Sequence, residues 1–181
     1  MRIISGILGG RKIKYPPNIR PTSEKVREAI FSMMDVKDKL FLDLFAGSGA
    51  VGIEAYSRGA KEVWFVEKNE RIHLILKENI KSLGVNGKAI RGNVFNVIKN
   101  LKKDFDIIFL DPPYDENLVQ KTLLSLKGRI NSDTIIIIES SKRELFEINN
   151  FEKIKEKKYG ETIITILKGA KNENSSISRD I

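Results

Sequence analysis

The feature that most constrains the fold is a strict alternation of strand-like and helix-like segments through the middle of the chain. Short apolar runs rich in β-forming residues predict strands at Leu40–Leu44, Val63–Val66, Ala89–Arg91, Phe105–Leu110 and Thr134–Glu139. Helical periodicity between these runs predicts helices at Ala50–Arg58, Glu70–Leu83, Val94–Leu101 and Asn117–Leu126. Since strands joined by helices run parallel, the pattern predicts an α/β fold with helices on both faces of the sheet.

The end of the chain follows a different pattern. Phe151–Lys158 and Thr162–Leu167 flank Tyr159-Gly160, which predicts two antiparallel strands joined by a tight turn. With these two strands the sheet has seven strands and is mostly parallel. The remaining residues, 170–181, are polar and predict a disordered tail. A chain of 181 residues can form one such domain, at 38–169, and is too short for two.

Residues 1–37 are predicted to form a small basic extension. The run R-I-I-S-G-I-L-G-G-R-K-I-K-Y indicates a hairpin that turns near Gly9-Gly10. An amphipathic helix follows, with Thr22 or Ser23 as its N-cap, and its apolar face holds Val26, Ala29, Ile30 and Met33. The extension would therefore hold basic side chains on a hairpin ahead of the first helix.

Charge is distributed unevenly along the chain. There are 32 Lys and Arg residues against 24 Asp and Glu, and six of the eight net positive charges lie in residues 1–27. This asymmetry favours a phosphate-rich partner, and a solvated basic face is the alternative. The sequence shows neither an apolar run that could span a bilayer nor the apolar core of a signal peptide, and it contains no cysteine. We expect a cytoplasmic protein, although the lack of cysteine is equally compatible with export.

A glycine-rich motif follows the first predicted strand. It reads L-D-L-F-A-G-S-G-A-V-G-I-E-A, and Gly47, Gly49 and Gly52 match G-x-G-x-x-G. Glycines let the backbone approach a ligand closely, although a tight turn with close helix packing needs them too. Glu67 ends the next strand twenty positions after Gly47, where an acidic side chain can accept both hydroxyls of a ribose. The pair predicts a site for a nucleoside cofactor.

Both a nicotinamide dinucleotide and S-adenosylmethionine present an adenosine to such a site. Only about seventy residues follow Asp111, most of them assigned to the sheet and its helices, so there is no room for the substrate domain of a dehydrogenase. Asp43 lies four residues before Gly47, where its charge would favour an ammonium group and oppose a pyrophosphate. These two observations favour S-adenosylmethionine.

The fourth predicted strand runs directly into Asp111-Pro112-Pro113-Tyr114. Prolines end the strand and leave carbonyl groups without sheet partners. This end lies at the carboxyl edge of the sheet, where α/β sheets bind ligands. The Asp111 carboxylate and the Pro112 carbonyl can accept hydrogen bonds from an exocyclic amine of a nucleobase, which localises the lone pair on that nitrogen, while Tyr114 can stack on the base. A simple turn is the alternative reading of this motif.

Several blocks of the sequence together resemble a known family. D-L-F-A-G-S-G followed by D-P-P-Y looks like the amino-methylating S-adenosylmethionine-dependent methyltransferases, which have a Rossmann-like fold. With R-I-I-S-G-I-L-G-G-R-K-I and R-P-T-S-E-K-V-R-E-A-I-F added, the chain resembles the bacterial RsmD type, which methylates guanine N2 in small-subunit ribosomal RNA. The resemblance covers residues 1–168.

The resemblance implies a role for particular residues. Asp43 to Gly49 would enclose the methionine part of the cofactor, Glu67 would bind the ribose, and Asn93 would contact the adenine. The full cofactor set expected is Asp43, Phe45, Ala46, Gly47, Ser48, Gly49, Glu67, Lys68, Asn93 and Val94. The expected catalytic residues are Asp111, Pro112 and Tyr114, and the expected RNA-binding residues are Arg11, Lys12, Lys14 and Arg20.

The sequence thus predicts an enzyme, a monomer without a metal, that methylates a guanine N2 in small-subunit ribosomal RNA or in its assembling particle. One alternative is a DNA methyltransferase acting on adenine N6 or cytosine N4, which shares D-P-P-Y, but no separate target-recognition region is visible. Another is a non-catalytic RNA-binding module, which the intact Asp111, Pro112 and Tyr114 disfavour.

Overall fold

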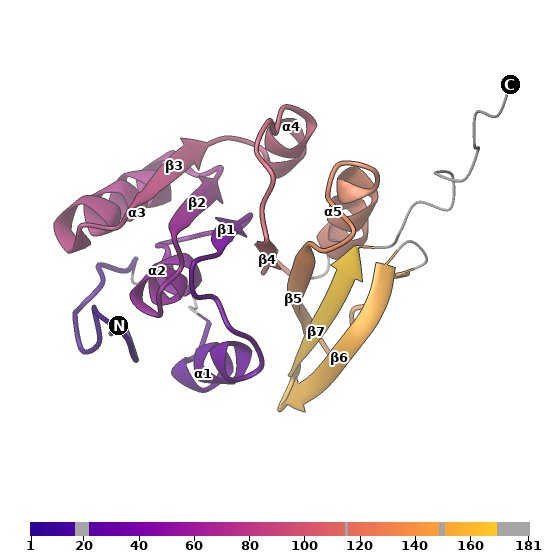
Figure 1. Cartoon of the computed structure of the whole chain (residues 1–181), viewed down its shortest axis with the longest axis horizontal. Coiled ribbons are helices and arrows are strands. Elements are labelled where there is room, and N and C mark those ends of the chain that lie inside the picture. The colour runs from indigo at the N-terminus through magenta and orange to yellow at the C-terminus, as the bar shows by residue number, and fades with distance from the viewer. Residues whose placement is uncertain (17–21, 115, 149–150, 170–181) are drawn as a thin grey trace, which may run out of the picture.

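The computed structural model describes residues 1–16, 22–114, 116–148 and 151–169 (Figure 1). The tail predicted at 170–181 and Arg20 of the predicted RNA-binding set lie outside these residues. None of the helices within the described ranges combines the length and apolar character needed to cross a membrane.

The described strands form one sheet with the order β3-β2-β1-β4-β5-β7-β6 (Figure 1). Its strands are β1 (Leu40–Asp43), β2 (Glu62–Glu67), β3 (Gly87–Arg91), β4 (Ile107–Leu110), β5 (Ile135–Ser141), β6 (Phe151–Tyr159) and β7 (Thr162–Gly169). Strands β1 to β5 run parallel to one another, whereas β7 is antiparallel to both β5 and β6. The prediction of a seven-stranded, mostly parallel sheet that ends in a hairpin is confirmed.

The helices follow the alternating pattern of the sequence. They are α1 (Glu24–Ser32), α2 (Ala50–Ser57), α3 (Glu70–Leu83), α4 (Val94–Lys99) and α5 (Leu118–Leu126). Each predicted strand or helix ends within two residues of the observed one. Ser23, one of the two predicted N-caps, does cap α1, since its hydroxyl accepts a hydrogen bond from Val26 N at 3.2 Å.

Two hydrophobic clusters form the core, one on each face of the sheet. The first packs α1, α2 and α3 against the sheet through residues such as Ile30, Ile53 and Leu76. The second packs α4 and α5 against the other face through residues such as Ile98 and Leu123. Burying apolar surface on both faces fixes the sheet, so the strand ends keep fixed positions relative to one another.

The N-terminal segment packs on α2 and shares the first cluster. Its predicted turn near Gly9-Gly10 is present, with one antiparallel bridge between Arg2 and Lys12, and Gly10 adopts φ 79° there. Ile3, Leu8 and Ile13 are buried in the same cluster as α2 and α3. The boundary that we place after residue 37 stays a prediction, but apolar residues on both sides of it share one core.

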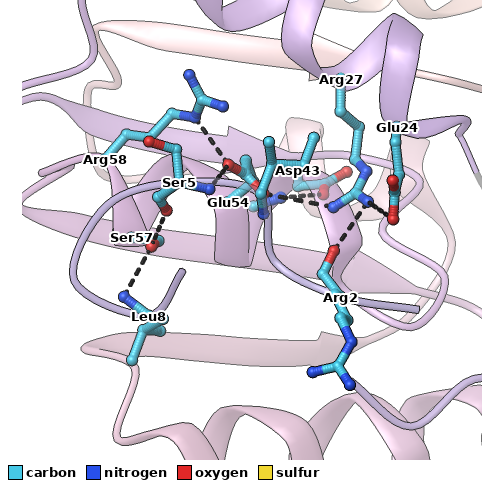
Figure 2. A network of polar contacts seen from close by, with 11 residues as sticks. Arg2, Ser5, Leu8, Glu24, Arg27, Asp43, Glu54, Ser57 and Arg58 are labelled. Carbon is cyan, nitrogen blue, oxygen red and sulfur yellow. Dashed lines mark hydrogen bonds and ion pairs between the residues drawn. The ribbon is translucent and has the colours of Figure 1, made fainter. Parts of the chain in front are cut away.

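A buried carboxylate ties this segment to α2 (Figure 2). Glu54 is fully buried and accepts hydrogen bonds from Ile4 N at 2.8 Å and Ser5 N at 3.1 Å. It also forms ion pairs with Arg58, at 2.7 Å, and with the fully buried Arg27 of α1, at 3.4 Å. The N-terminal segment, α1 and α2 are therefore held together through one side chain.

Candidate active site

A large cleft lies at the carboxyl ends of β1, β2 and β4. Its volume is about 1220 Å³, slightly above the usual range of ligand-binding sites. Parallel strands bring these three ends to one edge, so residues distant in sequence meet there. The predicted residues that line the cleft are Asp43, Phe45, Ala46, Gly47, Ser48, Glu67, Lys68, Asn93, Val94, Asp111, Pro112 and Tyr114.

The glycine loop forms one wall of this cleft, and its three glycines serve different purposes. Gly47 adopts φ 54°, and a Cβ added there would meet nothing within 4 Å, so the loop leaves open space beside it. Gly49 caps α2 with φ 90°, and an added Cβ would lie 2.6 Å from Leu76 Cδ1. An added Cβ at Gly52 would lie 2.3 Å from the Phe65 ring. Gly49 and Gly52 thus serve close helix packing, and Gly49 is absent from the cleft lining.

Glu67 links the end of β2 to the glycine loop. Its Oε2 accepts a hydrogen bond from Gly47 N at 3.0 Å, and its Oε1 accepts one from Asn69 N at 2.7 Å. A carboxylate has about four acceptor positions, so both oxygens keep capacity for further donors. The carboxylate is therefore held in place at the cleft wall and remains able to accept hydroxyl groups.

Asp43 lies at the end of β1 and is only 1% exposed. Its Oδ2 accepts a hydrogen bond from Gly52 N at 3.2 Å, while its Oδ1 is buried with no hydrogen-bond partner among the described residues. Burial raises the pKa of Asp43 to about 8, and the charges of Asp111 and Glu67 add to this rise, although the backbone N–H groups of Gly52 and Phe45 partly offset it. A buried carboxyl with an unused oxygen beside a cleft favours a positively charged ligand group.

Asp111 lies at the end of β4, the strand next to β1. Its Oδ2 accepts a hydrogen bond from the Thr22 hydroxyl at 3.0 Å. Burial raises the pKa of Asp111 to about 6, and the bond from Thr22 works against this rise. Pro112 is buried beside it, and Tyr114 is 43% exposed. The motif therefore presents a carboxylate and an aromatic ring to the same cleft.

Asn93 and Val94 lie at the start of α4, which follows β3. The Asn93 side chain caps this helix by accepting a hydrogen bond from Phe95 N at 2.9 Å. This capping role explains why an Asn precedes the apolar residues at this position. Both residues line the cleft, as does Lys68.

Three of the predicted RNA-binding residues, Arg11, Lys12 and Lys14, lie apart from the cleft lining. Arg11, Lys12 and Lys14 are exposed, and the structure brings them together on the N-terminal turn and the segment after it. Lys14 Nζ forms an ion pair with Glu78 of α3 at 2.7 Å. Tyr15, the next residue, does line the cleft. The basic surface is therefore continuous in sequence with the cleft without being part of it.

Sequence reasoning did not assign several residues of the cleft. Thr22, Glu139, Arg143 and Tyr159 all line it. The sequence does give an indication for Thr22, because it lies in R-P-T-S just before a helix. A threonine at that position can either cap the helix or contact a ligand. The others come from the ends of β5 and β6 and from the loop after β5, and no local pattern reveals which side chains such ends bring to the cleft.

The residues present fit S-adenosylmethionine. A buried, unpartnered Asp43 oxygen suits its ammonium group, the open space at Gly47 suits close approach of the chain to a ligand, and the Glu67 carboxylate suits its ribose hydroxyls. The sheet order, the glycine loop and these acidic strand ends define the class: a Rossmann-like, S-adenosylmethionine-dependent methyltransferase.

Comparison with known proteins narrows this class. The model of the family described as Conserved hypothetical protein 95 matches residues 1–168. The chain belongs to this family, that of ribosomal RNA small subunit methyltransferase D. The protein of that name from Buchnera aphidicola (subsp. Acyrthosiphon pisum) is 44% identical over 150 residues, covering 78% of each chain. The one from Escherichia coli K12 is 34% identical over 147 residues, covering 77% of this chain and 74% of its own.

Solved structures share the fold of this chain. A hypothetical protein from Thermus thermophilus is 30% identical, with a TM-score of 0.81, and the match covers 93% of this chain and 99% of that one. An RNA methyltransferase from Salinibacter ruber, in complex with S-adenosyl-L-homocysteine, has a TM-score of 0.67 at 16% identity over 84% of this chain and 95% of its own. The second likeness is one of fold alone.

Proposed function

We propose that this protein transfers a methyl group from S-adenosylmethionine to the exocyclic N2 amine of a guanine in small-subunit ribosomal RNA. The observation that carries the proposal is the position of Asp111-Pro112-Pro113-Tyr114 in the same cleft as Asp43 and Glu67. The ribosomal RNA substrate is supported by the names of the relatives. The choice of guanine N2 is supported only by the resemblance of the N-terminal blocks to the RsmD type.

When bound, S-adenosylmethionine supplies an electrophilic methyl group on a sulfonium. Asp43 would hold its ammonium group through the buried Oδ1, which has no other partner among the described residues. Glu67 would accept the ribose hydroxyls with the lone pairs that Gly47 N and Asn69 N leave free. Asn93 and Val94 would contact the adenine from the start of α4.

The amine is held by acceptors from the end of β4. A guanine N2 is a poor nucleophile because its lone pair is delocalised into the ring. The Asp111 carboxylate and the Pro112 carbonyl would each accept one N–H, which keeps the lone pair on nitrogen and directs it into the cleft. Because the prolines restrict the backbone here, little reorganisation is needed when charge develops on the amine.

Asp111 is also suited to receive the proton that the methylated amine releases. With a pKa of about 6 the carboxyl is ionised at neutral pH, and its pKa is closer to 7 than the pKa of an exposed aspartate is. Tyr114, which is 43% exposed, would stack on the plane of the target base from the rim of the cleft.

Arg11, Lys12 and Lys14 would bind RNA phosphates outside the cleft, and Arg20 would join them. Exposed basic side chains on a turn can contact a phosphate backbone without reading its sequence. This division leaves recognition of the base to the cleft and general affinity to the N-terminal surface.

The test is mass mapping of small-subunit ribosomal RNA from cells with and without the gene. We expect one guanine to lack a methyl group in the deletion strain and to regain it when the gene is restored. Identical methylation in both strains would contradict the proposed substrate. Methylation restored equally by Asp111→Ala would contradict the proposed role of the motif.

A further inference from the structure

Thr22 contacts the proposed catalytic carboxylate from a distant part of the sequence. Its Oγ1 lies 3.0 Å from Asp111 Oδ2, although the two residues are 89 positions apart. An ionised carboxylate only accepts hydrogen bonds, so the hydroxyl is the donor. Both side chains line the cleft and both are partly buried. The contact therefore joins the N-terminal segment to the end of β4.

The position of Thr22 is fixed by the helix that follows it. Ser23 caps α1, and Arg27 N donates to Ser23 O at 2.9 Å. The Arg27 guanidinium is fully buried and binds both Glu54 and the carbonyl of Arg2, at 3.4 and 3.0 Å (Figure 2). Since α2 starts at the glycine loop, the same ion pair fixes α1 relative to that loop. Because Thr22 directly precedes the residue that caps α1, these contacts also hold Thr22 at the cleft.

This bond leaves the two oxygens of Asp111 in different environments. Oδ2 faces Thr22, and Oδ1 is the oxygen that we assign to the amine of the substrate. A hydrogen bond from a fixed hydroxyl restricts rotation of the carboxyl group, and it also favours the ionised form. Both effects support an acceptor that must be ionised and correctly oriented before the base arrives.

We propose that Thr22 is a positioning residue that orients the Asp111 carboxylate and keeps it ionised for the methyl transfer. The proposal rests on the proposed function for its catalytic consequence, but not for its effect on Asp111 in the free protein. It makes the N-terminal segment part of the catalytic site and gives it a task besides RNA binding.

Other ionisable groups line the same cleft. Glu67 from β2, Glu139 from β5 and Glu161 before β7 are acidic, and so is Asp43 from β1, whose pKa of about 8 keeps it mostly protonated at neutral pH. Lys25 from α1, Lys68 after β2 and Arg143 after β5 are basic. A substitution at Thr22 leaves all of them in place. Any change in the titration of Asp111 in such a variant therefore reports the lost hydroxyl.

The experiment compares Thr22→Val, which removes the hydroxyl and keeps the shape, with Thr22→Ser, which restores a donor. Thr122→Val is the matched control, because Thr122 on α5 is buried outside the cleft and its hydroxyl has no partner among the described residues. The first measurement is the titration of the Asp111 carboxyl in the free protein by carbon-13 NMR, assigned with Asp111→Asn. The second is single-turnover methyl transfer as a function of pH.

We expect Thr22→Val to raise the pKa of Asp111 above its value of about 6, because the bond from Thr22 lowers it. The acidic limb of the rate profile should move to higher pH, with the rate below pH 6 falling on the order of tenfold, the scale of one hydrogen bond to a charged group. Thr22→Ser should restore both, and Thr122→Val should change neither.

An unchanged titration of Asp111 in Thr22→Val would overturn the proposal. So would a loss of rate that is equal at every pH and that Thr22→Ser does not restore. If the wild-type protein methylates no guanine of small-subunit ribosomal RNA, the proposed function fails instead. The titration of Asp111 in the free protein still decides the role of Thr22 in that case.

Discussion

The chain buries acidic side chains in two regions and treats them in opposite ways. On α2, Glu54 is surrounded by donors: two backbone N–H groups and the side chains of Arg27 and Arg58 (Figure 2). At the cleft, Asp43 is almost as buried but receives a bond from Gly52 N on one oxygen and has no partner for the other within the described residues. A buried carboxylate that is fully hydrogen-bonded within the protein stabilises the fold. One with an unused oxygen can still accept a hydrogen bond from a ligand.

The difference extends to Asp111. Its bond from Thr22 occupies one oxygen, and burial still raises its pKa to about 6. Perturbed carboxyls of this kind collect at functional sites because the fold does not neutralise them. The acidic groups of the cleft therefore differ from Glu54 in having fewer hydrogen-bond donors around them. Each prediction below tests either the structural carboxylate or the groups that serve the cleft.

The largest effect is expected at the ion pair behind the cleft. Arg27→Met should lower the free energy of unfolding by about 3 to 5 kcal/mol, because Glu54 remains buried with one charged partner fewer. Urea unfolding at pH 7 measures it. The control is Arg71→Met on the exposed face of α3, which should change stability by less than about 0.5 kcal/mol. An equal change in the free energy of unfolding for the two variants would contradict a structural role for the ion pair between Arg27 and Glu54.

At Asp111 the effect should fall on the reaction and not on the fold. Asp111→Ala should lower the single-turnover rate by about a hundredfold or more, the scale of losing one preorganised polar group, and leave cofactor affinity within a few fold. Asp104→Ala, an exposed aspartate ahead of β4, is the control. A rate near that of the wild type would contradict the role of the carboxylate in localising the lone pair.

Glu67 stands between the two kinds of carboxylate, since it is partly supplied with donors and still faces the cleft. Glu67→Ala should weaken S-adenosylmethionine binding by about 1.5 to 3 kcal/mol, because the ribose hydroxyls lose a charged acceptor. Titration calorimetry measures the dissociation constant, with Glu78→Ala on α3 as the control. An unchanged dissociation constant would mean that Glu67 only links β2 to the glycine loop through its hydrogen bond with Gly47 N.

The smallest effect is expected from the exposed charges of the N-terminal surface. Replacing Arg11, Lys12 and Lys14 with alanine should reduce the slope of log affinity for RNA against log salt by roughly 0.7 per lost single-strand contact. Cofactor affinity should not change, since none of the three lines the cleft. Replacing Lys99, Lys121 and Lys127 on the opposite layer removes the same charge. If both triple variants reduce the slope equally, RNA binding depends on the net charge of the protein and not on the N-terminal surface.

Much of this site could be predicted from local patterns. Strand and helix periods gave the sheet, and the glycine motif and D-P-P-Y gave residues that meet at its edge because parallel strands end together. Gly49 is an exception, since packing against Leu76 and its left-handed backbone explain it without a ligand.

The polar network could not be predicted in the same way. The bonds of Glu54 to Ile4 N and Ser5 N, and of Thr22 to Asp111, join residues 49 to 89 positions apart, and only the packed structure decides which groups meet. A signal for Glu54 did exist. It lies in A-V-G-I-E-A, a helix with apolar residues all around, where a charged side chain must find a partner.

The contrast is tested most directly by titrating the Asp43 carboxyl with and without S-adenosylhomocysteine, which carries the same ammonium group. In the free protein we expect a pKa of about 8, and ligand binding should lower it because a positive charge favours the ionised form. Affinity should then fall as pH decreases below 8, since binding must release a proton. Carbon-13 NMR with Asp43→Asn for assignment decides the matter. A normal pKa in the free protein, or a raised one that the ligand leaves unchanged, would contradict the account.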